Sequence, residues 1–255
     1  MTDWTNRTVF ITGATAGFGA AIARRYAAVG ARLVLLARRA ELLAQLAGEL
    51  GVPTHRIALD VRDKAGIFAA VAALPAEFAA IDVLVNNAGL ALGLEPAWDA
   101  DIDEWETMVD TNIKGLMYVT RAVLPGMVAR DKGHLVNLGS TAGTYPYPGG
   151  NAYGATKAAV KQLSLNLITD LVKTRVRVTN IEPGLCGGSE FSVVRFRGDA
   201  EKAAKVYANT TPLTADDIAE AVLWTTSLPA HVNINRIEMM PVTQAPAGLT
   251  VHKYE

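Results

Sequence analysis

The chain has 255 residues, 50% of which are hydrophobic, with a net charge of −1 and a pI near 6.4. Because its acidic and basic residues are interspersed and nearly balanced, no basic surface is expected that could attract a nucleic acid. A single cysteine, Cys186, excludes an internal disulfide. No apolar run approaches the roughly 18 residues of a membrane span, and no signal segment precedes Val9. We therefore expect a cytoplasmic protein without nucleic acid or membrane partners.

Short apolar runs alternate with helix-like stretches along the whole chain. Seven runs have the length and composition of strands: Val9–Ile11, Leu33–Ala37, Ile57–Leu59, Val83–Val85, Leu135–Leu138, Val176–Ile181 and Ile237–Met240. Buried parallel strands are continuous apolar runs connected by helices, so this alternation predicts an α/β fold with a doubly wound parallel sheet of about seven strands and helices on both faces. No linker or repeat interrupts the pattern, and we expect a single domain over residues 1–255.

A glycine-rich segment, residues 12–19, connects the first strand to an alanine-rich amphipathic stretch. At such a strand-to-helix turn, bare backbone N–H groups and the helix N-terminus can hold a pyrophosphate. The candidate cofactor-binding residues of this turn are Gly13, Ala14, Thr15, Ala16, Gly17 and Phe18. A glycine turn alone is weak evidence, because the glycines could serve only the close packing of the helix against the strand.

The end of the second strand indicates which dinucleotide would bind. An NAD-binding turn places Asp or Glu here to bind the ribose hydroxyls, whereas the 2′-phosphate of NADP requires cations. This chain has Arg38 and Arg39 at that point, which favours NADP as the cofactor. Two alternatives stay open: the arginines could merely begin the next helix, and Glu41 would suit NAD.

Tyr153 and Lys157 stand four positions apart, which places a phenol and an ammonium on one face of a helix. An ammonium near a phenol stabilises the phenolate and lowers the tyrosine pKa from about 10. Tyr153 is therefore a candidate proton donor to a carbonyl oxygen. Ser140 lies thirteen residues before it, just after the fifth strand. Because the carboxyl ends of parallel strands face one crevice, these residues and the glycine turn are expected to converge.

Three further motifs accompany these residues in the chain: Asn86-Asn87-Ala88-Gly89, Asn112 and Pro183-Gly184. With this combination the chain resembles the short-chain dehydrogenase/reductase family over essentially its whole length. The resemblance implies a Rossmann-type fold and an oxidoreductase that uses a nicotinamide cofactor. It also implies a homotetramer, because the long helices expected at Ile102–Arg130 and Tyr153–Val172 resemble those through which the family assembles.

The resemblance assigns a role to each matching residue. Tyr153 would be the general acid or base, Ser140 would hydrogen-bond the substrate oxygen, and Lys157 would hold the nicotinamide ribose. Asn112 would anchor a water that relays protons from Lys157 to solvent, or its side chain only satisfies a neighbouring backbone group. Asp60 would accept from the adenine amino group, or only cap the next helix. The other cofactor contacts are expected at Val61, Asn87, Pro183, Gly184, Leu185 and Ser189.

One departure from the family pattern lies in the segment after Pro183. The family commonly has Thr at the sixth position of this motif, where it helps to hold the carboxamide and phosphate, but this chain has Gly188. Ser189, one residue later, is expected to take its place. Cys186 falls near the expected nicotinamide position. Without a His or Lys partner in the sequence, we interpret it as a small buried thiol and not as a nucleophile.

The substrate is expected under a flap of about residues 185–212, where the periodic pattern loosens. Arg195 and Arg197 in this flap offer planar guanidinium groups to an anion. The candidate substrate-binding residues are Ser140, Tyr147, Tyr153 and Arg195. Within the family, the chain resembles the NADP-dependent 3-hydroxy acid dehydrogenases, which act on serine, allo-threonine and 3-hydroxypropionate and in reverse reduce malonic semialdehyde. Relatives of that branch reduce sulfoacetaldehyde, which is also a short aldehyde with an anionic end.

Other classes of protein fit the sequence less well. A serine hydrolase would need a Gly-x-Ser-x-Gly elbow, which is absent, and the four histidines are scattered without a metal-binding pattern. A nucleotide-sensing regulator would need the glycine turn but not the four candidate catalytic residues together. An epimerase or dehydratase would usually carry a longer C-terminal substrate domain. A reductase of uncharged carbonyls remains an alternative, because Arg195 could be a solvated flap residue.

The C-terminal tail, residues 243–255, has no periodicity. We expect it on the protein surface or on another subunit. In the second arrangement, His252 and Tyr254 could reach the substrate anion of a neighbouring site.

Overall fold

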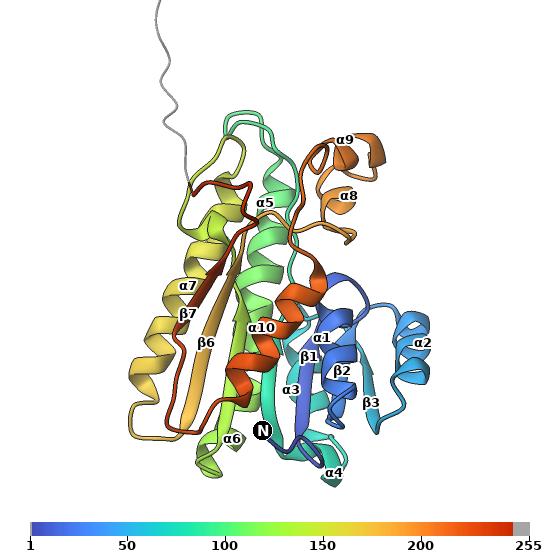
Figure 1. Cartoon of the computed structure of the whole chain (residues 1–255), viewed down its shortest axis with the longest axis vertical. Coiled ribbons are helices and arrows are strands. Elements are labelled where there is room, and N and C mark those ends of the chain that lie inside the picture. Colours follow the sequence, from blue (N-terminus) through green and yellow to red (C-terminus); the bar gives the residue numbers. More distant parts are fainter. Residues whose placement is uncertain (1, 247–255) are drawn as a thin grey trace, which may run out of the picture.

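The computed structural model describes residues 2–246 of the chain (Figure 1). Its centre is one sheet of seven parallel strands in the order β3-β2-β1-β4-β5-β6-β7. The strands are β1 (Thr8–Thr12), β2 (Arg32–Ala37), β3 (Thr54–Ala58), β4 (Ile81–Asn86), β5 (Gly133–Leu138), β6 (Val176–Pro183) and β7 (Arg236–Met239). The strand order reverses between β1 and β4, and ligands of such sheets bind beyond the carboxyl ends of the strands at this point. The predicted fold class is confirmed.

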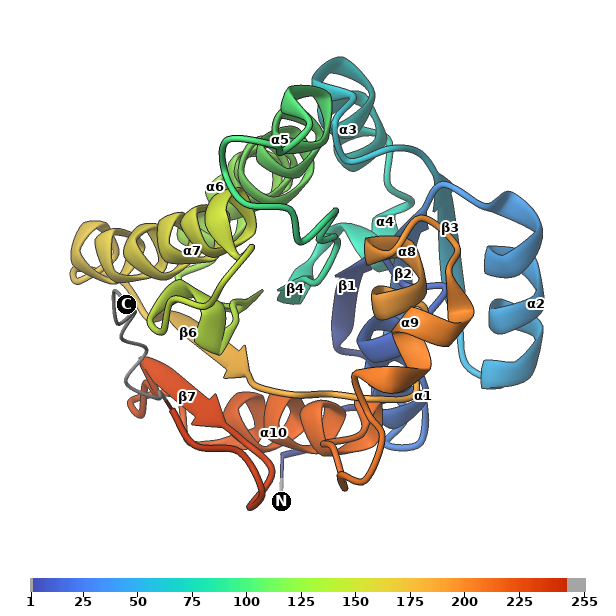
Figure 2. The same cartoon turned by 90° about the horizontal axis from the view of Figure 1, so that it is seen from above.

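Helices cover both faces of the sheet, as Figure 2 shows from above. They are α1 (Gly17–Ala27), α2 (Ala40–Leu50), α3 (Lys64–Ala72), α4 (Ala76–Ala79), α5 (Ile102–Val109), α6 (Leu116–Ala129), α7 (Asn151–Asp170), α8 (Phe191–Arg195), α9 (Ala200–Lys205) and α10 (Ala215–Ser227), with a π-helical turn η1 (Asp110–Gly115) and a 3-10 turn η2 (Thr141–Gly143). On one face, α1, α2 and α10 pack against side chains such as Val9 and Leu33. On the other face, α3, α6 and α7 pack against Phe10 and Val34.

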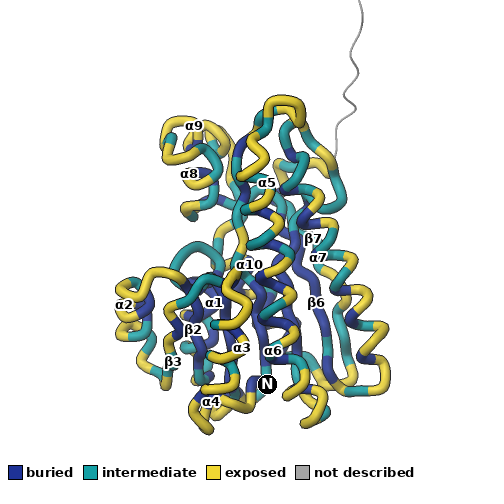
Figure 3. The backbone as a smooth tube through the Cα atoms, turned by 180° about the vertical axis from the view of Figure 1, so that it is seen from behind, coloured by how far each residue is buried: buried dark blue, intermediate teal, exposed yellow. Residues whose placement is uncertain are grey.

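The strands are buried from both sides, because successive side chains point to opposite faces and each face has its own core. All five residues of β1 and five of the six residues of β2 are buried. Figure 3 shows a dark-blue sheet between helices whose outer faces are yellow. This burial explains why the strands stand in the sequence as continuous apolar runs.

Two elements differ in detail from the sequence predictions. β3 spans Thr54–Ala58 and not Ile57–Leu59, because a strand at the edge of a sheet tolerates the polar residues that precede Ile57. The helix expected over Ile102–Arg130 is divided by the π-helical turn η1, which separates α5 from α6.

The segment expected as a flap, residues 185–212, contains α8 and α9. Figures 1 and 2 place both helices above the sheet, near the ends of β1 and β2. The predictions for His252 and Tyr254 lie outside the described residues. Within residues 2–246, no helix has the length and apolar character needed to cross a bilayer.

Candidate active site

The glycine turn after β1 is held tightly against the end of β4. Gly13 has φ +65°, and a Cβ atom there would lie 2.9 Å from the amide nitrogen of Asn87. Asn87 donates this amide to the backbone oxygens of Thr12 (2.8 Å) and Gly13 (3.0 Å). A Cβ atom at Gly19 would collide with the carbonyl of Gly13. Glycine is therefore required at both positions, and Asn87 shapes the turn through its amide.

The turn leads into α1, whose first N–H groups are open to a ligand. Ala16 is the N-cap residue and makes no side-chain capping bond, and the first turn of α1 contains no acidic residue. Uncapped N–H groups at the positive end of the helix dipole favour an anion. Ser189 of the flap lies beside this turn, since its Cβ is 3.1 Å from the position that a Cβ of Gly17 would occupy. The turn, which also contains Ala14, Thr15 and Phe18, fits the pyrophosphate of a dinucleotide.

The two arginines after β2 lie in different surroundings. Arg38 is exposed, and no Asp or Glu ends the strand. Arg39, the N-cap residue of α2, forms a bidentate ion pair with Glu190 of the flap, with distances of 2.9 and 3.3 Å. The sequence did not predict this pair, because its members are 151 residues apart. A 2′-phosphate would therefore meet Arg38 directly and would compete with Glu190 for Arg39.

Asp60 and Val61, which follow β3, both contact other residues of the protein. The carboxylate of Asp60 accepts hydrogen bonds from the backbone nitrogen (2.9 Å) and the guanidinium (2.8 Å) of Arg62, which lower the pKa of Asp60. Val61 is buried against η1, where a Cβ at Gly115 would come 2.7 Å from its methyl group. Asp60 caps no helix, because Asp63 is the N-cap residue of α3. An adenine contact by Asp60 stays a prediction.

β5 and α7 bring three predicted catalytic residues to the same end of the sheet. Ser140 follows β5 as the N-cap residue of η2, and its hydroxyl accepts from the backbone nitrogen of Ala142 at 3.1 Å. Tyr153 and Lys157 lie on the first turns of α7, and both side chains are buried. Lys157 donates to the carbonyl of Leu138 at 2.8 Å, and its Nζ lies 5.8 Å from the ring centroid of Tyr153.

The expected lowering of the Tyr153 pKa by Lys157 is wrong for this structure. Burial raises the pKa of Tyr153 to about 12, and a hydrogen bond with the Ser140 side chain and the charge of Arg195 only partly oppose the shift. Burial also lowers the pKa of Lys157 to about 8, because the ammonium is desolvated without a carboxylate partner. Desolvation is the main cause of both shifts, and Tyr153 is held as a neutral phenol.

Asn112 lies in the π-helical turn η1, a type of distortion frequent at functional sites. Its amide nitrogen donates to the carbonyl of Leu90 (2.8 Å) and to the hydroxyl of Thr156 (3.0 Å) on α7. Its carbonyl oxygen accepts from the backbone nitrogen of Leu90 at 2.9 Å. Asn112 therefore joins the loop after β4 to the helix that carries Tyr153 and Lys157. The predicted water relay stays a prediction.

Arg195, at the end of α8, places its side chain beside the candidate catalytic residue Tyr153. Its guanidinium lies 5.5 Å from the ring centroid of Tyr153 and 5.3 Å from that of Tyr147. It donates to the hydroxyl of Tyr147 (2.6 Å) and to the carbonyl of Gly93 (3.2 Å). Within residues 2–246, no carboxylate lies within ion-pair distance of Arg195. Its charge is therefore uncompensated beside a buried phenol.

Arg197 does not join Arg195 in an anion-binding fork. It pairs with Glu95 (3.0 Å) and Glu104 (2.6 Å), and its side chain is half exposed. These two carboxylates raise the pKa of Arg197 and neutralise its charge. The expectation that both arginines offer an anion site is corrected to Arg195 alone.

The segment after β6 closes the site from the side of β7. The carbonyl of Pro183 accepts from the hydroxyl of Ser140 at 3.4 Å. Leu185 donates its backbone nitrogen to the side chain of Gln244 at 2.7 Å, and Gln244 also lies against Gly184. The sequence did not single out Gln244, because it stands in an unpatterned tail 59 residues away. Burial raises the pKa of Cys186 to about 12, which agrees with an inert thiol.

Comparison with known proteins identifies the class to which this fold and site belong. The model of the short chain dehydrogenase family matches residues 7–196, and the chain belongs to that family. Among its relatives, it is 63% identical to an NADP-dependent 3-hydroxy acid dehydrogenase of Salmonella typhi, over 96% of this chain and 99% of that protein. It is 50% identical to a serine 3-dehydrogenase of Agrobacterium fabrum, over 96% of this chain and 98% of that protein.

Solved structures agree with these relatives. The fold superposes with a TM-score of 0.95 on the closed form of a serine dehydrogenase complexed with NADP+, which is 61% identical and is aligned over 97% of this chain and all of that chain. A serine dehydrogenase from Escherichia coli gives a TM-score of 0.82 at 55% identity, over 93% of this chain and 99% of that chain.

Proposed function

We propose that this protein is an NADP(H)-dependent oxidoreductase that interconverts a short anionic hydroxy compound and its aldehyde. The observation that carries the proposal is the uncompensated guanidinium of Arg195 beside the buried phenol of Tyr153. The guanidinium of Arg195 is suited to bind the anionic end of a substrate, and the phenol of Tyr153 is suited to exchange a proton with its reacting oxygen. The names of the relatives, a 3-hydroxy acid dehydrogenase and a serine 3-dehydrogenase, support a small hydroxy acid as the substrate.

The cofactor site is built from the glycine turn, the uncapped start of α1 and Arg38. The N–H groups of α1 would hold the pyrophosphate, and Arg38 with Arg39 would bind the 2′-phosphate that distinguishes NADP from NAD. Ser189 and the segment from Pro183 to Leu185 would hold the nicotinamide end. When bound, NADP(H) supplies or accepts the hydride. The relatives named as NADP-dependent and the NADP+ complex support this choice of cofactor.

The proton would be handled by Tyr153. With a pKa raised to about 12, its phenol keeps the proton at neutral pH and can donate it to the oxygen of an aldehyde as that oxygen gains negative charge. Ser140 would donate a hydrogen bond to the same oxygen and orient it. Lys157, fixed by the carbonyl of Leu138, would hold the ribose and return a proton to Tyr153 after each turnover. Asn112 would anchor a water that relays protons between Lys157 and solvent.

The anion can be a carboxylate, as in 3-hydroxy acids and malonic semialdehyde, or a sulfonate, as in isethionate and sulfoacetaldehyde. The guanidinium of Arg195 suits both, because its planar donors can bind two oxygens at once. A screen of NADPH oxidation with malonic semialdehyde, sulfoacetaldehyde and succinic semialdehyde tests the proposal. We expect kcat/KM to be highest for a three-carbon carboxylate. Activity only with uncharged aldehydes would refute the assignment of an anionic substrate.

We also propose that the protein is a homotetramer that assembles through α6 and α7. An apolar groove of about 300 Å³ lies between these helices and is lined by Met117, Leu163 and neighbouring residues. Met117 on α6 and Leu165 on α7 are 47% and 40% exposed, so both helices present apolar surface that a neighbouring chain would cover. Light scattering should give the mass of four chains, and Met117→Glu should weaken the assembly. A stable monomer at micromolar concentration would contradict this proposal.

A further inference from the structure

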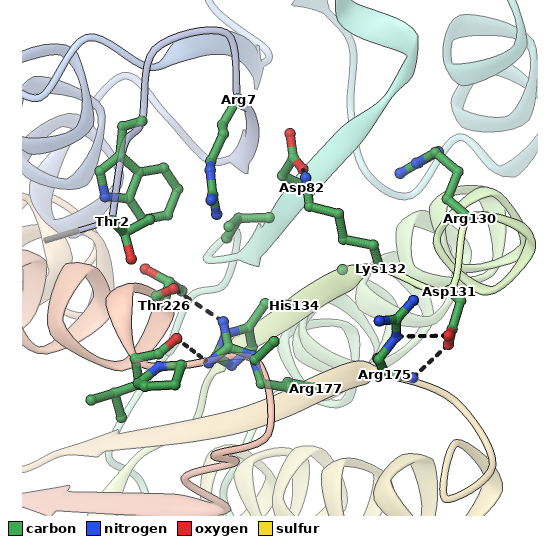
Figure 4. Close-up of a pocket in the computed structure, with 16 residues that line it drawn as sticks. Thr2, Arg7, Asp82, Arg130, Asp131, Lys132, His134, Arg175, Arg177 and Thr226 are labelled. Carbon is green, nitrogen blue, oxygen red and sulfur yellow. Dashed lines mark hydrogen bonds and ion pairs between the residues drawn. The ribbon is translucent and has the colours of Figure 1, made fainter.

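A cavity of about 440 Å³ lies at the amino ends of the strands, at the opposite end of the sheet from the candidate active site. Its walls come from the segment before β1, the starts of β4, β5 and β6, the turn after α6 and the end of α10. Figure 4 shows these side chains converging on one space. None of the residues proposed to bind cofactor or substrate lines this cavity.

The charges around the cavity are unbalanced. Five cationic side chains line it, against two carboxylates: Arg7, Arg130, Lys132, Arg175 and Arg177, against Asp82 and Asp131. Both carboxylates are already occupied. Asp82 binds Lys132 at 2.6 Å and accepts from the backbone nitrogen of Thr8, and Asp131 binds Arg175 at 2.8 Å. Within residues 2–246, Arg7, Arg130 and Arg177 form no salt bridge, although the charge of Arg7 does act on the exposed Asp3.

Arg7 and Arg130 keep N–H groups free for a ligand, whereas Arg177 is held by backbone carbonyls. The guanidinium of Arg7 lies 5.5 Å from the ring centroid of Trp4, and within the described chain its side chain donates no hydrogen bond. Arg130 donates one Nη to the carbonyl of Ile81 at 2.6 Å, which leaves its other N–H groups free. Arg177 is bound to backbone carbonyls around the end of α10, so its position is fixed.

A buried histidine lies behind the same wall, and its ring is closed to the cavity. His134, at the start of β5, is 1% exposed, and its Nε2 lies 2.8 Å from the hydroxyl of Thr179. Its Nδ1 is buried and has no hydrogen-bond partner among the described residues. Burial and the nearby charge of Arg177 lower the pKa of His134, so the ring is neutral and one nitrogen can carry a proton to donate. Buried polar atoms without partners are uncommon in proteins.

From this geometry we infer that the cavity is a binding site for a compact multivalent oxyanion, whose oxygens the guanidinium groups of Arg7 and Arg130 bind and whose charge Arg177 balances. Guanidinium groups bind phosphate and carboxylate oxygens in pairs, which suits both kinds of anion. Burial is the main cause that lowers the pKa of Arg177, and the charge of Arg7 adds a smaller repulsion, which an anion in the cavity would relieve. The cavity is large enough for a small phosphorylated or polycarboxylate metabolite.

Isothermal titration of the NADP+-saturated protein tests the inference, with pyrophosphate in one arm and citrate in the other at constant ionic strength. Saturation with NADP+ keeps the probes out of the proposed cofactor site. We expect one saturable site per chain. Arg7→Gln and Arg130→Gln should each raise its Kd roughly ten- to a hundred-fold, the range for a lost charge-assisted contact. Arg56→Gln, which removes an exposed arginine of β3 outside the cavity, should leave the Kd unchanged.

The two arms distinguish the kinds of anion. Binding of pyrophosphate alone assigns a phosphate site, binding of citrate alone assigns a polycarboxylate site, and binding of both supports the shared chemistry. Thermal unfolding without ligand checks that each variant is folded. If Arg130→Gln does not fold, Arg7→Gln decides, since the Arg7 side chain donates no hydrogen bond among residues 2–246. No saturable binding, or equal weakening in Arg56→Gln and Arg7→Gln, overturns the inference.

Discussion

Substrate recognition by Arg195 can be isolated with one substitution and two substrates. Arg195→Ala removes a guanidinium that uses only part of its donor capacity, on Tyr147 and Gly93, and has no carboxylate partner in the described chain. A charge-assisted hydrogen bond is worth about 1.5–3 kcal/mol. At about 1.4 kcal/mol per factor of ten, KM for an anionic aldehyde should rise roughly ten- to a hundred-fold. An uncharged aldehyde of equal length should be nearly unaffected.

The assay follows NADPH oxidation under steady-state conditions with malonic semialdehyde and propanal. Arg197→Ala is the matched control, because Arg197 belongs to the same flap but pairs with Glu95 and Glu104. It should change KM for the two substrates by the same small factor. If Arg195→Ala loses activity in parallel on both aldehydes, Arg195 supports the flap through its contact with Gly93 and does not recognise charge.

Four further predictions concern the proton donor, the cofactor and pH. Tyr153→Phe should lower kcat about 10²–10⁴-fold with NADPH binding unchanged in fluorescence titration, and a variant that keeps half its kcat would exclude Tyr153 as the acid. Replacing Arg38 and Arg39 with alanine should weaken NADPH far more than NADH, whereas equal weakening would reject their contact with the 2′-phosphate. Glu190→Gln frees Arg39 from an exposed ion pair worth about 0–1 kcal/mol, so Kd for NADPH should fall by up to about fivefold while Kd for NADH stays constant. Because the pKa of Tyr153 is about 12, its phenolate fraction rises with pH, and kcat/KM for alcohol oxidation should increase between about pH 7 and 9; a flat profile would contradict this.

Much of the fold could be predicted because its strands are buried on both faces. β1 and β2 are apolar throughout, so their runs stand out without any knowledge of their neighbours. β3 lies at the edge, and its polar first half carries no such signal. The π-helical turn η1 was not predicted either, and its residue Asn112 bonds to Leu90 and Thr156, which are distant in sequence.

Features of the candidate site that depend on local sequence could be predicted, whereas those that depend on distant residues could not. The i,i+4 spacing of Tyr153 and Lys157 and the glycine turn are local patterns, and the structure places both at the carboxyl end of the sheet. The partner of Arg39 is 151 residues away from it, and the two partners of Arg197 are 93 and 102 residues away, so no sequence pattern indicated which arginines are neutralised. Nothing in the sequence distinguishes Arg195 from Arg197. In the described structure Arg197 is paired with carboxylates and Arg195 is not.

The pKa of Tyr153 shows why spacing alone gave the wrong sign. A helical neighbour at i+4 brings an ammonium close, but the same packing removes water from both groups, and desolvation disfavours both charged forms. Lys157 consequently has a pKa of about 8 and donates to the carbonyl of Leu138, so it offers the phenolate little support. The protein without ligand therefore holds a proton on Tyr153, ready for donation to an aldehyde. Oxidation of an alcohol requires this proton to leave Tyr153 first. The rate of alcohol oxidation should therefore depend on pH more strongly than the rate of aldehyde reduction.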